Sequence, residues 1–246
     1  MKLFKFFKKK KENNIWWSRV VYYKKNHHLL RRKFRLSKSI ISNFSQCHQD
    51  LFFLMMSDGK KNGTYLEIGC NDPFESNNTA ILEGLISYKG LSIDILKSQC
   101  MNFANKRANP VINANALKLN YKTLFKKFNF FKKNIDYLSI DCEPASTTYS
   151  VLKKIIKSGY KFSVITFEHD YYNAKNQIDK NILEESRAFL KKNGYLLIVN
   201  NISVDAYHPH EDWYAHPDLI KKKIIKNMIS INNLTKKSED YIFGKI

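Results

Sequence analysis

The sequence predicts an α/β fold in which a doubly wound, mostly parallel sheet carries helices on both faces. Short apolar runs alternate with amphipathic helical segments along the middle of the chain, as they do where crossover helices join parallel strands. Several apolar runs end in polar or acidic residues, and one run, Tyr65–Asp72, turns at a glycine. That layout is typical of a strand that opens onto a nucleotide-like ligand. The length of 246 residues suits one such domain with tails.

The first half of the sheet follows from apolar spacing and turn residues. The elements expected there are a helix over 46–56, a strand over 64–69, a helix over 78–87, a strand over 90–95, a helix over 97–107 and a short strand over 111–114. Turns at Gly59 and Gly63 separate the first helix from the first strand. Ile81, Leu82 and Leu85 share one face of the second helix, which predicts that this face is buried.

The second half continues the same alternation. The elements expected there are a strand over 135–141, a helix over 145–158, a strand over 162–167, a helix over 181–192 and a strand over 195–200. The last helix ends at Asn193 and Gly194, which form a common C-terminal stop signal.

The net charge of +20 is concentrated at the two ends of the chain. Residues 1–38 carry +13 and residues 221–246 carry +5, which leaves +2 for residues 39–220. We therefore expect a basic, aromatic-containing arm over 1–40, a catalytic domain over 41–220 and a basic tail over 221–246. The arm could be a solvated tail, rest on an anionic membrane surface or touch RNA. The near-neutral middle argues against a long groove that tracks phosphates.

Cysteine spacing and the lack of long apolar runs indicate the cellular compartment in which the protein works. The four cysteines show no paired spacing, which fits a reducing environment and gives no zinc or disulfide signal. No apolar run approaches a membrane span, and residues 1–11 lack the continuous apolar core of a secretory signal. We expect a cytoplasmic protein, with peripheral contact at the inner face of a membrane as an option.

Chemistry should concentrate where the strands end, because ligands of such sheets bind at the carboxyl edge. The polar residues at these ends are Glu67 and Gly69, Asp94, Asn115 with Ala116, Asp141 and Glu143, and Glu168 with His169. Asp94 follows Gly69 by 25 residues, close to the offset at which an acid receives ribose hydroxyls. Asn71 and Pro73 replace further glycines of a dinucleotide fingerprint, which favours a nucleoside without phosphates, such as S-adenosylmethionine.

Several motifs together resemble the FkbM family of S-adenosylmethionine-dependent methyltransferases, over roughly residues 44–217. The motifs are Ser45–Asp50, Tyr65–Asp72, Ser76–Thr79, Asp136–Glu143, Ile165–His169 and Glu211–Tyr214. The chain departs from the family where Cys47 or His48, Pro73 and Pro144 replace glycines. The resemblance implies a Rossmann-like class I methyltransferase sheet of seven strands, one of them antiparallel. It also implies O-methylation of hydroxyls on a sugar, a glycan or another small metabolite.

The resemblance further implies roles for the strand-end residues. Glu67, Gly69 and Asn71 would cradle the methionine end of the cofactor, and Asp94 would bind its ribose. Asn115 and Ala116 would flank the adenine, and Asp141 would contribute to both cofactor binding and catalysis. The motif at Glu211–Trp213 would be a loop that covers the acceptor pocket.

Removal of the acceptor proton leaves two mechanisms open. In the first, Glu143 or His169 acts as general base. In the second, Asp141 and Glu168 hold Mg²⁺ through their oxygens. Three histidines at 208–216 could suggest zinc, but their spacing fits no common signature.

Two other functions compete with a sugar O-methyltransferase. One is an RNA methyltransferase that uses the basic arms, although no Asp-Pro-Pro-Tyr run follows the strand over 135–141. The other is a degenerate fold that binds membranes or nucleic acid without catalysis. Retention of Glu67, Asp94, Asp141 and Glu143 together argues against a dead site. We therefore expect a small-molecule or glycan partner rather than nucleic acid.

Overall fold

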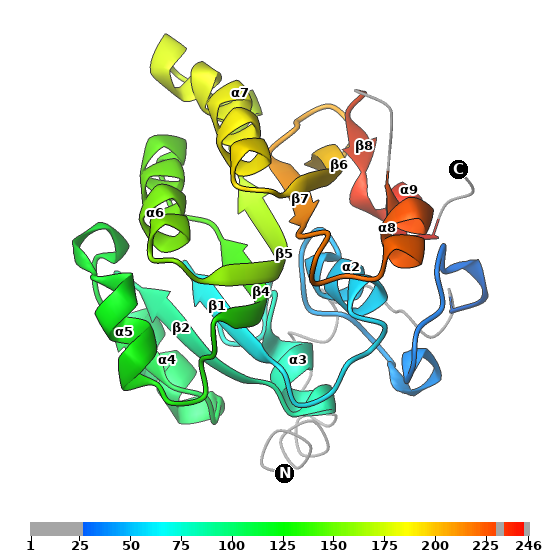
Figure 1. The fold of residues 1–246 in the computed structure, drawn as a ribbon, viewed down its shortest axis with the longest axis horizontal. Helices are drawn as coiled ribbons and strands as arrows, with labels where there is room; N and C mark the ends of the chain where they lie inside the picture. Colours follow the sequence, from blue (N-terminus) through cyan, green and yellow to red (C-terminus); the bar gives the residue numbers. More distant parts are fainter. Residues whose placement is uncertain (1–26, 230–233, 244–246) are drawn as a thin grey trace.

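The computed structural model describes residues 27–229 and 234–243 and has the expected α/β architecture (Figure 1). The strands are β1 (Thr64–Ile68), β2 (Lys89–Asp94), β3 (Val111–Asn113), β4 (Asn134–Ile140), β5 (Lys161–Glu168), β6 (Leu196–Ser203), β7 (Glu211–Ala215) and β8 (Lys236–Lys237). They form one sheet in the order β3-β2-β1-β4-β5-β7-β6-β8. The order reverses at β1 and β4, where a doubly wound sheet binds its ligand.

The sheet confirms the predicted class with two differences. It has eight strands within the described residues rather than seven, because the two-residue β8 pairs with β6. The single antiparallel element is β7, which lies between β5 and β6. The expectation that Glu211–Trp213 forms a covering loop is therefore wrong. All five residues of β7 are buried, since the strand is paired on both edges and covered on both faces.

Helices cover the two faces of the sheet as predicted (Figure 1). One face carries α2 (Gln49–Met56), α3 (Ala80–Ile86), α8 (Lys222–Met228) and α9 (Ser238–Phe243). The other carries α5 (Tyr121–Lys127), α6 (Ala145–Lys157) and α7 (Gln177–Lys192), while α4 (Lys97–Lys106) packs on β2 and β3. Short 3-10 turns occur at Ser37–Ser39, Ala116–Lys118 and Tyr171–Asn173. Successive residues of a strand point to opposite faces of the sheet and so belong to two separate hydrophobic cores. Tyr65 and Tyr137 belong to the core that contains α2, whereas Leu66 and Leu138 belong to the core that contains α6.

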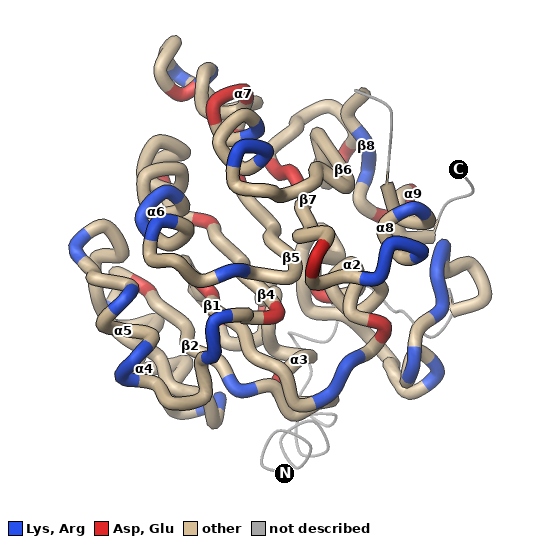
Figure 2. Tube along the Cα trace, viewed as in Figure 1, with Lys and Arg blue, Asp and Glu red and all other residues tan. Residues whose placement is uncertain are grey.

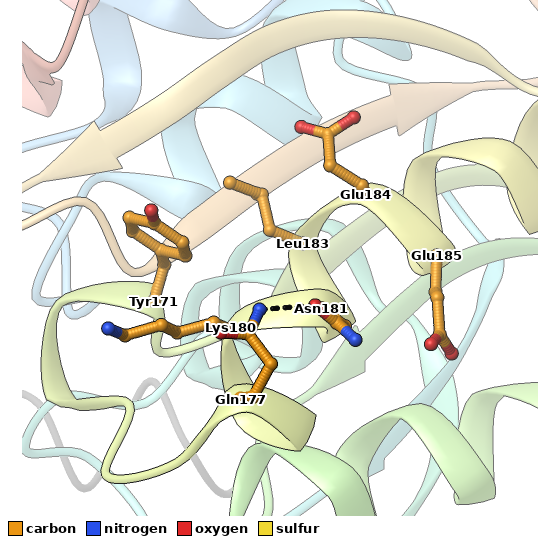
Figure 3. Close-up of a pocket in the computed structure, with 7 residues that line it drawn as sticks. All are labelled: Tyr171, Gln177, Lys180, Asn181, Leu183, Glu184 and Glu185. Atoms are coloured by element: carbon orange, nitrogen blue, oxygen red, sulfur yellow. Dashed lines mark hydrogen bonds between the residues drawn. The ribbon is translucent and has the colours of Figure 1, made fainter.

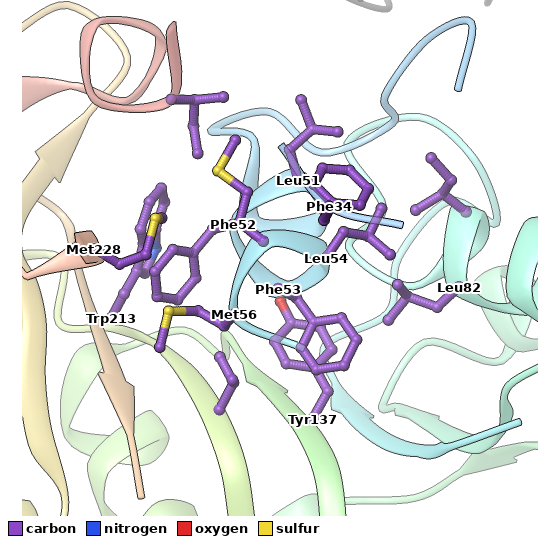
Figure 4. Packing of buried hydrophobic residues seen from close by; sticks show 14 of the residues in the cluster. Phe34, Leu51, Phe52, Phe53, Leu54, Met56, Leu82, Tyr137, Trp213 and Met228 are labelled. Carbon is purple, nitrogen blue, oxygen red and sulfur yellow. The ribbon is translucent and has the colours of Figure 1, made fainter. Parts of the chain in front are cut away.

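Helix α2 is the centre of the first core (Figure 4). All eight of its residues are buried. Phe52 stacks on Trp213 with ring centroids 4.5 Å apart, and Phe53 stacks on Tyr137 at 4.7 Å. These contacts join α2 to two strands of the sheet, β7 through Trp213 and β4 through Tyr137. A helix apolar on all sides is expected to be buried in this way.

Both segments flanking the predicted catalytic domain contribute to its core. Residues 221–243, expected as part of a basic tail, contain α8 and α9, whose Met228, Tyr241 and Ile242 are fully or almost fully buried. In the segment before residue 41, the guanidinium of Arg31 lies 4.3 Å from the centre of the Tyr241 ring of α9. Residues 1–26 of the predicted arm lie outside the described residues. No helix in 27–229 or 234–243 has the length and apolar character needed to cross a membrane.

We expect Trp213→Ala to lower the free energy of unfolding by about 3–5 kcal/mol, because it leaves a large cavity against Phe52. Urea unfolding followed by circular dichroism measures the change. The control is Tyr207→Ala, since Tyr207 is 82% exposed and its loss should change stability by no more than about 0.5 kcal/mol. Equal losses for the two variants would contradict a core centred on α2 and β7.

Candidate active site

The register of the parallel strands brings the predicted site residues to one level at the carboxyl edge. Ile68 of β1 is paired with Ile93 of β2 and with Ile140 of β4. The next residue on each strand is therefore Gly69, Asp94 and Asp141. Ile140 is in turn paired with Phe167 of β5, so Glu168 follows at the same level.

Gly69 is required at the turn after β1. Its φ is +80°, and a Cβ atom there would lie 1.7 Å from the carbonyl oxygen of Asp141. The Gly69 N–H donates to the carbonyl of Ile93 at 2.8 Å, and the Asp141 N–H donates to the carbonyl of Ile68 at 3.1 Å. The backbones of β1, β2 and β4 are thus closed tightly around a residue without a side chain.

Asp94 organises the two loops that border the β1 turn. Its carboxylate accepts the Asn71 N–H at 2.9 Å and the Leu96 N–H at 2.8 Å. Each oxygen keeps a further lone pair, so the group can still accept two ligand hydroxyls. Beside it the side chains of Ile95 and Leu96 are 63% and 55% exposed, an apolar surface next to a carboxylate. We did not predict a role for this pair, although two apolar residues directly after an acid at a strand end could have indicated an apolar contact surface beside the site.

Asn115 and Ala116 lie on the loop after β3, on the far side of Asp94. The Ala114 N–H donates to the carbonyl of Asp94 at 2.9 Å, which ties this loop to β2. The side chain of Asn115 accepts the Leu117 N–H at 2.9 Å and begins a 3-10 turn. Both predicted adenine-flanking residues are therefore close to Asp94, and both are half-buried.

Glu67 lies inside the fold and supports the site from behind. Its carboxylate accepts the hydroxyls of Thr79 at 2.9 Å and Ser92 at 2.8 Å, and burial raises its pKa. The fully buried side chain of Arg107 donates to Thr79 at 3.1 Å, to Asn77 at 3.0 Å and to the Pro73 carbonyl at 2.9 Å. This network fixes the loop between β1 and α3. Arg107 was not predicted, because nothing in its neighbourhood distinguishes it from the many exposed basic residues.

The carboxyl groups of Asp141 and Glu168 follow paired positions at the ends of β4 and β5, and each affects the ionisation of the other. Burial raises the pKa of Asp141, although part of its side chain stays exposed to solvent. Burial, followed by the negative charge of Asp141, raises the pKa of Glu168 well above its usual range. Two neighbouring carboxyl groups ionise together only with difficulty, which fits the raised pKa of each.

Glu211 of β7 stands opposite Glu168 in the antiparallel register. Burial raises its pKa to about 8. Gln49 donates to its carboxylate at 2.8 Å, and the amide oxygen of Gln49 accepts the Cys47 N–H at 2.9 Å. Two sequence motifs about 160 residues apart therefore meet behind Glu168.

Glu143 lines a pocket at the mouth of the site. The pocket has a volume of about 260 Å³ and lies between the loops after β4 and β5. Its lining comprises Glu143, Pro144, Ala145, Asp170, Asn173, Ala174, Lys175 and Asp179. A second pocket of about 370 Å³ lies beside it, lined by Tyr171 after β5 and by residues of α7 (Figure 3). Most of the residues that line the two pockets carry hydrogen-bonding side chains.

His169 is not brought together with the other predicted catalytic residues. Its side chain is fully buried, its Nδ1 accepts the Tyr171 N–H at 3.2 Å, and its Nε2 lies 3.6 Å from Asp212. Asp212 also accepts two bonds from Arg187, at 2.7 and 3.1 Å. Burial alone would raise the pKa of Asp212, but His169 and Arg187 outweigh it and hold that pKa below the usual range. This cluster ties β5, β7 and α7 together.

The predicted Mg²⁺ ligands lie side by side without a completed metal site. Among the residues that the structure describes, no group of three or more His, Cys, Asp or Glu side chains is arranged to hold a metal ion. That finding covers both the pair Asp141 and Glu168 and the histidines of the 208–216 segment.

Comparison with known proteins gives only distant similarities. The sequence matches no protein-family model and no curated protein. Solved structures with a similar fold include an rRNA methylase from Streptococcus thermophilus, 12% identical over 68% of this chain and 94% of that one, with a TM-score of 0.45. An O-methyltransferase from Bacillus cereus in complex with SAH is 11% identical over 69% and 80%, with a TM-score of 0.49. The N-terminal domain of EvdMO1, in the presence of SAH and D-fucose, is 10% identical over 70% and 82%, at 0.47.

The pKa of Glu211 predicts a pH effect on stability. Because its pKa is about 8 in the folded protein and about 4.3 in an unfolded chain, folding favours the protonated acid. The contribution of the Glu211 side chain to the free energy of unfolding is fully present below pH 4.3 and is lost as the pH rises through 8. Glu211→Gln keeps a partner for Gln49 but cannot ionise. We expect this variant to gain about 3 kcal/mol relative to the wild type between pH 6 and pH 9.

Urea unfolding at several pH values checks this expectation. Glu239→Gln is the control, because Glu239 is an exposed acid on α9. Parallel pH profiles for the wild type and Glu211→Gln would show that Glu211 is ionised throughout.

Proposed function

We propose that this chain is an S-adenosylmethionine-dependent O-methyltransferase of the FkbM kind, acting on a hydroxyl of a sugar, a glycan or its precursor. The observation that carries the proposal is the common level of Gly69, Asp94 and Asp141 at the point where the strand order reverses. These three residues fit a nucleoside cofactor that carries a reactive group. Gly69 leaves no room for a Cβ at the turn, Asp94 keeps lone pairs for ligand hydroxyls, and Asp141 supplies an acid at the same edge.

The residues around Asp94 fit the nucleoside half of this cofactor. The free lone pairs of Asp94 would accept the two ribose hydroxyls. Ile95 would pack on one face of the adenine, with Asn115 and Ala116 at its edge. The backbone of Gly69 and Asn71 would leave room for the methionine half, while Glu67 holds the loop from inside. When bound, the cofactor supplies an electrophilic methyl group on a sulfonium.

The residues around Asp141 fit the acceptor half of the reaction. A sugar hydroxyl must lose its proton as the methyl group is transferred, and it must lie in line with the sulfonium. Asp141 and Glu143 offer exposed carboxylates for this proton, whereas His169 is fully buried. Carboxylates and amides lining the pocket at Glu143 suit a polyhydroxyl acceptor. Mg²⁺ is not part of this proposal.

Isothermal titration with S-adenosylmethionine tests the cofactor. We expect binding by the wild type and at least tenfold weaker binding by Ile95→Asp, because a charge would replace the apolar contact with adenine. Leu29→Asp serves as the matched control, since Leu29 is 47% exposed and far along the chain from Asp94. If the wild type fails to bind the cofactor, the proposed function falls.

Turnover tests the acids. We expect Asp141→Asn or Glu143→Gln to reduce methyl transfer by 100-fold or more, on the order of what a general base contributes, and Glu143→Gln to leave cofactor binding nearly intact. Mass spectrometry of host glycans with and without the protein should reveal one added methyl group and thus an acceptor for the assay. Glu239→Gln is the control. Unchanged turnover in both acid variants would show that neither Asp141 nor Glu143 takes part in the reaction.

A further inference from the structure

The amino-terminal edge of the sheet, opposite the candidate site, is lined with lysines. Lysines stand immediately before or at the start of four neighbouring parallel strands (Figure 2). They are Lys60 and Lys61 before β1, Lys89 on β2, Lys132 and Lys133 before β4, and Lys161 on β5. All six side chains are exposed. Since parallel strands start at one edge, these charges lie along a single side of the molecule.

Further basic residues widen this lysine edge. Arg35, Lys60 and Lys61 line one recess of about 350 Å³. Arg35, Lys60 and Lys221 line a neighbouring one of about 360 Å³. Helices α4, α5, α6 and α7 also end at this side of the sheet, each with lysine in its last turn. Those helix-end lysines complement helix dipoles, but the strand-start lysines do not have this role.

Acidic residues neutralise only part of the lysine edge. Lys60 pairs with Asp136 at 2.6 Å, Lys161 with Asp218 at 3.4 Å and Arg35 with Asp58 at 3.8 Å. Lys61, Lys89 and Lys132 form no ion pair within residues 27–229 and 234–243. The strands of the opposite edge end in Asp94, Asp141 and Glu168 instead, although Lys97, Lys122 and Lys180 lie in the first turns of the helices that begin there.

We propose that the lysine edge docks on an anionic lipid surface and holds the candidate site facing away from the bilayer. Several lysines spread over one side suit the diffuse charge of lipid headgroups, to which each contributes separately. The proposal concerns the folded domain and is independent of the methyl-transfer reaction.

The same geometry disfavours RNA as the partner of this edge. An RNA substrate would have to reach the carboxyl edge, where the strand ends are acidic. A strand of eight residues such as β5 spans about 26 Å. That is several times the screening length of about 8 Å at physiological salt. The field of the strand-start lysines is therefore largely screened at Asp141.

Vesicle co-sedimentation of the full chain tests the proposal. Lys61, Lys89 and Lys132 are changed together to Gln. The matched control changes Lys97, Lys122 and Lys180 to Gln, which removes the same charge from exposed lysines in the first turns of α4, α5 and α7. The probes are phosphatidylcholine vesicles with and without phosphatidylglycerol, at low and high salt.

We expect salt-sensitive binding only to vesicles that contain phosphatidylglycerol, weakened roughly 100-fold by the edge variant and much less by the control. Equal weakening by both variants would mean that total charge, not this edge, governs binding, and would overturn the proposal. So would an unaffected edge variant. If vesicles are not bound and the edge variant instead loses binding to a single-stranded RNA, the partner is nucleic acid and the lipid assignment is wrong.

Discussion

The close approach of the β1 turn to β4 is the constraint on which the candidate site depends. Only a glycine allows the Asp141 carbonyl so near the turn, and this contact fixes the level at which β1, β2 and β4 end. The carboxylate of Asp94 then binds the loop that leaves the turn, and Arg107 binds the same loop from the interior. Backbone contacts therefore position the residues of the proposed cofactor and acceptor sites.

The acidic half of the site is held by residues brought from distant parts of the chain. Gln49 donates to Glu211, Glu211 stands opposite Glu168, and Glu168 neighbours Asp141 at the ends of β5 and β4. His48, just before α2, adopts a φ of +59°, a conformation that favours glycine. Its Nδ1 lies 3.1 Å from the Ser238 hydroxyl of α9, and its ring packs edge-on against Phe243. The C-terminal segment thus supports a strained position in the motif that carries Gln49.

The sequence predicted the sheet well, because strand and helix periods differ clearly and the strand ends carry polar residues. It missed β7 because Glu211–Ala215 is short, polar at its start and bounded by prolines, so only its pairing on both sides reveals it as a strand. Glu168 and His169 are adjacent and both polar, and a strand turns such neighbours in different directions. Which of them faces the site depends on register, which one sequence does not determine. Arg107 could not be predicted for a similar reason. Only its burial distinguishes it from the exposed basic residues of the chain, and burial cannot be read from residue type.

The position of β7 has a consequence for the order in which this protein is made. β7 enters the sheet between β5 and β6, and α8 and α9 pack beside it. During synthesis from the N-terminus, the half of the sheet around β1 and β4 can form while β5 still has an open edge. Glu211 reaches its place opposite Glu168 only after β7 has been synthesised. A chain that ended before β7 would keep Gly69, Asp94 and Asp141 but lack the strand that stands opposite Glu168.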